Sequence, residues 1–215
     1  ANTLRLAHYP HSLYTVQQAD KLGLVVMAEV PFVNQSAYAT RTDCSQGTAD
    51  TETTGLNPKK DEIITIGAVL IKGDKILASK RFEATLKTKL EITKESIRIH
   101  HIRNCDIEDG MEPKEAIESF LRFIGPRKLV GYYLEFDVAM INKYAKEFIG
   151  TTLPNPQTEV SALYFDKKND VFGSKNVDLR FESIMKELDL PIFGQHSAYY
   201  DALMTSLIFV KLKKS

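Results

Sequence analysis

Two acidic residues, Asp50 and Glu52, stand two positions apart in the stretch Ala49-Asp-Thr-Glu-Thr-Thr-Gly-Leu. On an extended strand this spacing places both carboxylates on one face. The residues that follow, 53–58, are typical of a turn, so the strand is expected to end at the acids. Two carboxylates that point the same way repel each other unless a cation lies between them, and a divalent metal that also holds phosphate oxygens suits this position. The alternative is a pair of solvated acids at a strand end.

Three further candidate residues lie in the second half of the chain. Asp137 follows Leu-Glu-Phe at the start of an expected helix, where it could be an N-cap for free backbone N–H groups. His196 is expected in the loop before the last helix, and Asp201 in the first turns of that helix. Taken alone, Asp201 could interact with the helix dipole and His196 could be an ordinary turn residue. Only their combination with the acidic pair favours a catalytic role over a structural one.

The expected elements give these residues a scaffold. Residues 62–71 are typical of a strand, 72–75 of a hairpin turn and 76–86 of the returning strand. Asp50 and Glu52 would then lie on the first strand of an antiparallel meander. Further along we expect a short strand at 128–133 and helices at 93–101, 112–124, from 137, around 181–188 and at 198–212. This order predicts an α/β fold with a mixed sheet flanked by helices.

Composition limits the classes of protein. The chain has 215 residues and is 43% hydrophobic, enough for one domain with an appendage. Lys plus Arg and Asp plus Glu both number 28, so no global positive field indicates non-specific duplex binding. Cys44 and Cys105 are not spaced as a metal-ligand cluster, and we expect a reduced, cytoplasmic setting without a signal peptide. The longest apolar run, 24–33, is too short to cross a bilayer, so no membrane partner is expected.

Residues 1–37 are expected to form a strand–helix–strand appendage, with the helix at 13–22. The motifs Asn2-Thr-Leu-Arg, His8-Tyr-Pro and Met27-Ala-Glu-Val-Pro resemble part of the barrel of glycoside hydrolase family 2. The piece would supply roughly one and a half of eight βα units, and the family's catalytic Asn-Glu motif and nucleophile are not found downstream. We expect His8 and Glu29 to be remnants. Residues 38–48 are expected to be a polar linker or seam, with the main domain at 49–215.

The motifs after residue 48 resemble a second family. Asp-x-Glu-Thr-Thr-Gly from Asp50, Phe-Asp at Asp137, and His-x-Ala-x-x-Asp-Ala from His196 occur in the order and spacing of DnaQ-like 3′–5′ exonucleases. That group includes polymerase III epsilon proofreading subunits, ribonuclease T and oligoribonuclease. The segment 95–103 is also similar to the family's connector. The resemblance covers residues 49–212 and implies a ribonuclease H-like fold, and the histidine five residues before the last Asp implies the DEDDh subclass.

The resemblance also implies roles. His196 would be the general base, and the metal ligands would be Asp50, Glu52, Asp137 and Asp201. Two divalent ions, Mg²⁺ or Mn²⁺, could clamp the attacking and leaving oxygens, and an imidazole with a pKa near ~6.5 could take a proton from water. The products would be nucleoside 5′-monophosphates from single-stranded DNA or RNA 3′ ends, with a polymerase subunit as a candidate partner. The backbone at Thr53, Thr54 and Gly55 would approach the terminal nucleotide.

Other features leave alternatives open. Tyr132, Tyr133 and Phe136 could stack on unpaired bases or could simply pack at a strand end, and the family has His-Asn in place of the two tyrosines. The polar residues 45–48 stand where apolar strand residues are expected, which predicts a shortened central strand and a destabilised sheet. One alternative is a short-RNA exoribonuclease, and activity on oligomers that differ only at the 2′-hydroxyl would distinguish it from a DNA exonuclease. The other is an inactive nucleic-acid-binding module, which metal titration would distinguish because such a module would bind no Mg²⁺ or Mn²⁺ through Asp50 and Asp201. Glycosidase activity of the N-terminal piece is not expected.

Overall fold

The structure is a computed structural model that describes residues 3–6, 25–28, 45–172, 177–194 and 196–214. It divides into two compact units, residues 1–43 and 44–215. In the first unit, β1 (Thr3–Leu6) pairs in parallel with β2 (Val25–Ala28), so both expected strands are present. The helix expected at 13–22, and the residues His8 and Glu29, lie outside the described residues.

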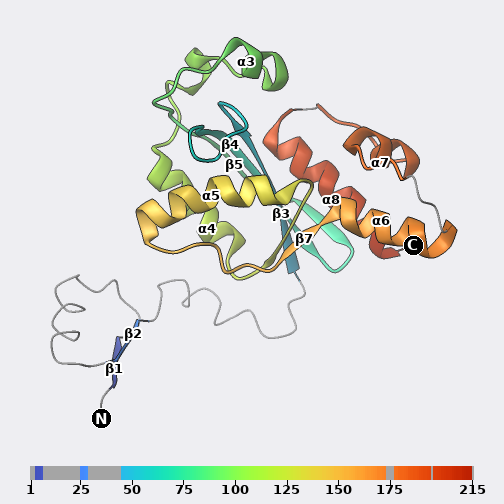
Figure 1. The fold of residues 1–215 in the computed structure, drawn as a ribbon, viewed down its shortest axis with the longest axis horizontal. Helices are drawn as coiled ribbons and strands as arrows, with labels where there is room; N and C mark the ends of the chain where they lie inside the picture. The colour runs from blue at the N-terminus through green and yellow to red at the C-terminus, as the bar shows by residue number, and fades with distance from the viewer. Residues whose placement is uncertain (1–2, 7–24, 29–44, 173–176, 195, 215) are drawn as a thin grey trace. The chain divides into compact units, whose positions relative to one another are not determined.

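The second unit is built on a five-stranded mixed sheet with the order β5-β4-β3-β6-β7 (Figure 1). Three strands form the antiparallel meander that the sequence predicts: β3 (Ser45–Thr53), β4 (Ile63–Lys72) and β5 (Lys75–Thr85). Two short strands, β6 (Lys128–Gly131) and β7 (Gln157–Glu159), extend the sheet in parallel to β3. The acid-bearing strand is therefore the central strand, and the predicted mixed α/β class is confirmed.

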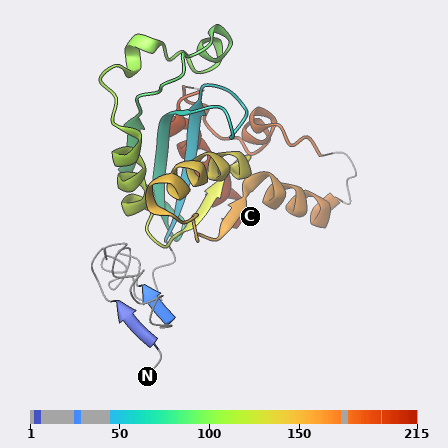
Figure 2. The ribbon, with the colours of Figure 1, turned by 60° about the vertical axis from the view of Figure 1, so that its left-hand side comes forward.

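Helices cover both faces of this sheet (Figure 2). The helical elements are α3 (Lys94–His100), the 3₁₀ helix η1 (Asn104–Ile107), α4 (Pro113–Ile124), α5 (Leu134–Ile149), α6 (Val160–Phe172), α7 (Phe181–Glu187) and α8 (Ala198–Lys214). α4 and α5 cover one face, and α8 crosses β3, β4 and β5 on the other, with α6 and α7 beside it. None of the helices in the described part of the chain is long and apolar enough to cross a membrane.

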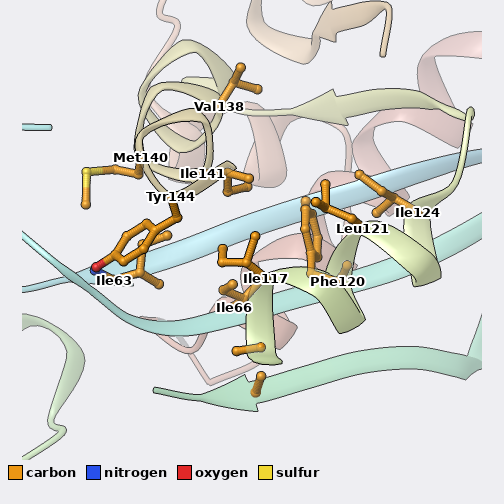
Figure 3. Packing of buried hydrophobic residues seen from close by; sticks show 14 of the residues in the cluster. Ile63, Ile66, Ile117, Phe120, Leu121, Ile124, Val138, Met140, Ile141 and Tyr144 are labelled. Carbon is orange, nitrogen blue, oxygen red and sulfur yellow. The ribbon is translucent and has the colours of Figure 1, made fainter. Parts of the chain in front are cut away.

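The core between α4, α5 and the sheet follows the predicted helical stripe. Ile117, Phe120, Leu121 and Ile124 of α4 are all buried, as their spacing indicates, and they pack with Ile63 and Ile66 of β4 (Figure 3). Each such side chain contributes roughly 1.5–3 kcal/mol when buried. The Tyr144 hydroxyl accepts a hydrogen bond from the Ile63 backbone N–H at 3.2 Å, so its polar end is satisfied inside the core.

The prediction of a shortened central strand is wrong, as is the assignment of residues 45–48 to a linker. Strand β3 has nine residues, starts at Ser45 and pairs with β4 over its whole length. Thr48 is fully buried, yet its hydroxyl donates to the Val69 carbonyl at 3.2 Å and lies 2.6 Å from the Ser206 hydroxyl of α8. A central strand satisfies its backbone on both edges, and small polar residues fit it when their side chains find partners.

Candidate active site

The end of β3 carries the acidic pair on the face that α8 covers. Thr48, Asp50 and Glu52 alternate along the strand, so they share one face, and Thr48 contacts Ser206 of α8 there. The first turn of α8 adds Asp201 to the pair. Carboxylate oxygens of Asp50, Glu52 and Asp201 all lie within 4.8 Å of one another. The structure thus brings together three of the predicted site residues from positions 150 residues apart in the sequence.

A glycine on the neighbouring strand lets α8 come this close. Gly67 of β4 is the cross-strand partner of Asp50. A Cβ atom at Gly67 would lie 2.1 Å from the carbonyl carbon of Ala198, the first residue of α8. Only a glycine leaves room for the helix backbone at this point. Because Asp201 is one turn further along α8, this contact sets its carboxylate beside Asp50.

The three carboxylates lie in a setting that opposes negative charge. Burial, together with the charges of Asp137, Asp201 and Glu52, raises the pKa of Asp50 well above its usual range. Burial and the nearby acids raise the pKa of Glu52 to about 8, and burial raises the pKa of Asp201 to about 6. Among the ion pairs of the described residues, none neutralises these three side chains. Hard oxygen ligands without a protein cation are the donor set that Mg²⁺ or Mn²⁺ takes, so the residues fit a divalent metal.

Asp137 is held differently from the other three acids, and it is not the N-cap that its position taken alone allowed. Helix α5 starts at Leu134 with Tyr133 at the cap position, so Asp137 lies inside the first turn. Its Oδ1 atom accepts hydrogen bonds from the Thr51 backbone N–H at 2.9 Å and from the Thr51 hydroxyl at 2.6 Å. β6 ends at Gly131, next to the Val130–Thr48 pair, so Asp137 takes the place of a strand partner for Thr51.

Asp137 stays outside the group of three but acts on it electrostatically. Its charge contributes to the raised pKa values of Asp50 and Glu52. Burial raises the pKa of Asp137 itself to about 7, although the hydrogen bonds from Thr51 act in the opposite direction. The fourth predicted acid is therefore at the site, anchored to the acid-bearing strand through Thr51.

His196 lies immediately before α8, as the sequence predicts. Its side chain is exposed and its backbone has a φ of 60°. A hydrogen bond from its backbone to the Asp201 carboxylate works against the rise in the pKa of Asp201. His196, Asp50 and Asp201 line one cavity of about 520 Å³. The cavity thus has an exposed imidazole and two half-buried carboxylates in its lining.

The threonines of the turn after β3 use their hydroxyl groups within the turn. The Thr53 hydroxyl donates to the Gly55 carbonyl at 2.7 Å, and the Thr54 hydroxyl donates to Asp61 at 3.2 Å. The Thr54 carbonyl in turn accepts a hydrogen bond from Ser96 of α3 at 2.8 Å. The side chains of Thr53 and Thr54 therefore fix the shape of the turn, and its backbone stays the predicted contact for a nucleotide.

The three aromatic candidates divide into two kinds. The Tyr132 hydroxyl donates to the Leu179 carbonyl at 2.9 Å and its ring meets Phe181 edge-on, so it packs between β6 and α7. The Tyr133 side chain is 69% exposed and its ring stacks on Phe136 with an interplanar angle of 13°. Only Tyr133 offers a largely exposed ring face.

Sequence reasoning did not find four residues that shape the site: Thr51, Gly67, Arg180 and Lys186. Arg180 and Lys186 line the same cavity as His196. A glycine in a strand is a signal for close backbone approach, and it could have singled out Gly67. Lys186 lies on a helix of seven residues and Arg180 directly precedes it, and nothing in their spacing ties them to the acids.

The chain is similar to known exonucleases. The family model described as Exonuclease matches residues 48–209. The chain is 30% identical over 164 residues to the DNA polymerase III subunit epsilon of Aquifex aeolicus, covering 76% of this chain and 77% of that protein. It is 29% identical over 188 residues to the PolC-type DNA polymerase III of Thermotoga maritima, covering 87% of this chain but 13% of that protein.

Solved structures agree on the fold. A crystal structure of E. coli exonuclease I in complex with a dT13 oligonucleotide superposes with a TM-score of 0.67 at 14% identity, covering 80% of this chain and 41% of that one. This likeness confirms the predicted ribonuclease H-like arrangement. The chain thus spans less than half of that structure and about an eighth of the PolC-type relative, although it spans most of the epsilon subunit.

The N-terminal resemblance is also found. A second family model, described as Glycosyl hydrolases family 2, TIM barrel domain, matches residues 1–65 and overlaps the exonuclease match at residues 48–65. The exonuclease match covers three quarters of the chain and includes the acid-bearing strand, the middle helix and α8. The chain therefore belongs to the exonuclease family.

Proposed function

We propose that this protein is a metal-dependent 3′–5′ exonuclease that releases nucleoside 5′-monophosphates from single-stranded DNA or RNA 3′ ends. The observation that carries the proposal is the group of Asp50, Glu52 and Asp201, whose oxygens lie within 4.8 Å of one another. Three carboxylates so close, with raised pKa values and no protein cation among the described ion pairs, fit a metal centre better than a structural cluster. Family membership gives that centre its reaction class.

The metal ligands would be Asp50, Glu52 and Asp201, with Asp137 completing the set on the Thr51 side. Divalent ions bound there would polarise phosphate oxygens and lower the pKa of the attacking water. They would also neutralise the repulsion that raises the pKa values of the acids, so the carboxylates would be ionised at neutral pH.

In this reaction His196 would act as the general base. A water oxygen attacks phosphorus, and the bond from phosphorus to the 3′ oxygen of the preceding nucleotide breaks. His196 is exposed in the cavity that Asp50 and Asp201 line, so its imidazole can accept the proton of the attacking water. A proton returns to the 3′ oxygen of the shortened strand. The mononucleotide leaves with the phosphate on its 5′ oxygen.

The test is degradation of a 5′-labelled single-stranded oligonucleotide, with released mononucleotides identified chromatographically. We expect a ladder that shortens from the 3′ end with Mn²⁺ or Mg²⁺ and none with EDTA. Asp201→Asn should lower the rate about 10³-fold, because it removes a metal-ligating charge worth several kcal/mol in the transition state. A folded, metal-saturated protein without a ladder, or an Asp201→Asn variant with the wild-type rate, would contradict the proposal.

The similar proteins indicate which substrate and which partner to propose for this chain. The exonuclease I structure is a complex with a dT13 oligonucleotide, and the curated relatives are polymerase III proteins. We therefore take single-stranded DNA as the first substrate to test, and a polymerase subunit as the first partner. Oligonucleotides that differ only in the 2′-hydroxyl would decide between DNA and RNA. Co-elution with a purified polymerase subunit on size exclusion would test the association.

A further inference from the structure

The cavity beside the acidic group has a wall of opposite charge. Asp50 and Asp201 line it from β3 and α8, and helix α7 and the residue before it contribute Lys186 and Arg180. The cavity measures about 520 Å³. Glu182 and Ser183 also line it, so the cations do not form an isolated basic patch. Arg and Lys side chains are among the groups with which proteins contact the phosphates of a nucleic acid strand and fix its register.

Arg180 and Lys186 differ in the hydrogen bonds and ion pairs that their side chains form. Arg180 forms a bidentate pair with Asp178, with contacts of 2.6–3.1 Å, and Ser183 donates to the same carboxylate at 2.7 Å. Lys186 is exposed, and among the hydrogen bonds and ion pairs of the described residues none involves its ammonium group. Its charge is therefore available to a ligand in the cavity, while that of Arg180 is largely balanced.

The position of the cavity indicates which phosphate would reach Lys186. The turn 53–55, which the terminal nucleotide is proposed to approach, does not line this cavity, whereas Asp50 does. Asp50 and Asp201 therefore share this cavity with Lys186, and the turn does not. With the bond to be cleaved at the acids and the terminal nucleoside at the turn, the preceding nucleotide extends toward α7. Its 5′-phosphate is the next anion along the strand.

We propose that Lys186 binds the 5′-phosphate of the penultimate nucleotide, so that α7 forms a phosphate subsite next to the hydrolytic centre. The inference rests on the proposed function. The subsite would make the enzyme selective for substrates that carry a second phosphate. Lys186 is a positioning residue here, because it holds the strand and does not touch the reacting bond. The subsite favours substrates of two or more phosphates over a mononucleotide ester.

The experiment compares two dinucleotides that differ only in a 5′-terminal phosphate, with wild-type protein, Lys186→Met and the control Lys114→Met. Lys114 is also exposed on a helix, but α4 lies on the opposite face of the sheet. We expect wild type and the control to prefer the phosphorylated dinucleotide about tenfold in kcat/KM, as a charge-assisted hydrogen bond allows. Lys186→Met should lower kcat/KM for the phosphorylated dinucleotide about tenfold more than for the unphosphorylated one, which erases the preference.

A salt series gives a second kinetic readout. On a longer oligonucleotide, the slope of log kcat/KM against log salt should become shallower by about 0.7 in Lys186→Met, the value for one lost phosphate contact on a single strand. The control should keep the wild-type slope. Equal losses on both dinucleotides, or a retained tenfold preference in Lys186→Met, would overturn the subsite.

A binding measurement separates failure of the subsite from failure of the proposed function. In an Asp201→Asn background, where turnover is expected to be slow, the Kd values of the two dinucleotides should differ about tenfold, and Lys186→Met should remove the difference. If wild type releases no mononucleotide but this difference in Kd is present, the exonuclease proposal fails and the subsite stands. If mononucleotides are released but the Kd values are equal, the subsite fails alone.

Discussion

At the scale of single residues, the site depends on how acids that resist ionisation are held together. Asp50 and Glu52 share a strand face because of their spacing, but Asp201 joins them only through the path of α8. Asp137 joins through two hydrogen bonds from Thr51. Each acid is thus fixed by a contact other than a metal ligand bond. The metal-free protein therefore holds its carboxylates close at an electrostatic cost that depends on pH.

We predict that the metal-free protein loses stability as pH rises from about 4.5 to 8. The folded pKa of Glu52, about 8, lies above its ordinary value of 4.5, so the folded state keeps protons that the unfolded state has released. The free energy of unfolding then falls with pH, by on the order of 4 kcal/mol from Glu52 alone. Denaturant unfolding in EDTA across this range measures the slope.

Metal and a single substitution provide the controls for this pH dependence. Mn²⁺ should restore stability most strongly at pH 8, because it binds the ionised carboxylates. Glu52→Gln should flatten the slope in EDTA, since it removes the group whose folded pKa is about 8. A stability in EDTA that increases steadily from pH 4.5 to 8 would contradict the raised pKa values.

We predict that Thr51→Val lowers kcat about tenfold with little change in KM. The Thr51 hydroxyl donates to Asp137 at 2.6 Å, and loss of a hydrogen bond that orients a metal-site carboxylate is expected to cost ~10–100-fold in activity. Thr51→Ser keeps the hydroxyl and should stay within about threefold of wild type. Steady-state kinetics on a fixed oligonucleotide measures both variants, and equal activity of the valine and serine variants would mean that the hydroxyl does not position Asp137.

At the scale of elements, the contact between β4 and the start of α8 is the decisive one. We predict that Gly67→Ala disrupts it, because a Cβ atom would lie 2.1 Å from Ala198. The helix start must move, so we expect a loss of roughly 2–3 kcal/mol in unfolding free energy and loss of Mn²⁺ affinity at Asp201. Thermal unfolding and metal titration by calorimetry measure these effects.

A matched glycine in the adjacent strand controls for backbone effects. At Gly47 of β3 the nearest atom to an added Cβ is a Leu70 side-chain carbon at 3.7 Å, an ordinary contact. Gly47→Ala should therefore change stability by less than about 1 kcal/mol and leave metal affinity intact. If Gly67→Ala were tolerated as well as Gly47→Ala, the close packing of α8 would not be what places Asp201.

At the scale of the whole molecule, we predict that the start of β3 marks where the catalytic unit begins. Removing residues 1–43 should leave activity within about twofold, because the cores of the sheet consist of residues from 49 onward. Removing residues 1–48, as the predicted domain boundary allows, also deletes Gln46, Gly47 and Thr48. These three residues supply the whole pairing of β3 with β6. The longer truncation should therefore fail to unfold cooperatively, as circular dichroism during heating would show.

The sequence alone determined the family and much of the scaffold. The two-residue spacing of Asp50 and Glu52 fixes a shared face on any strand, and the stripe of α4 fixes which side is buried. The order of the motifs sufficed to indicate the family, which the comparisons confirm. These features are local, because each depends on backbone periodicity or on side chains a few residues apart.

Only the tertiary structure decided the features that depend on partners distant in sequence. Residues 45–48 form a central strand because β4 and β6 pair with them, although their polarity suggests a linker. Asp137 is a partner of Thr51 and not an N-cap because β6 ends before reaching it. The polar segment of β7 and the cations beside the acids likewise gain their roles from neighbours. Propensity describes a residue in isolation, whereas these positions are set by groups about 20 to 90 residues away that supply hydrogen bonds or charge.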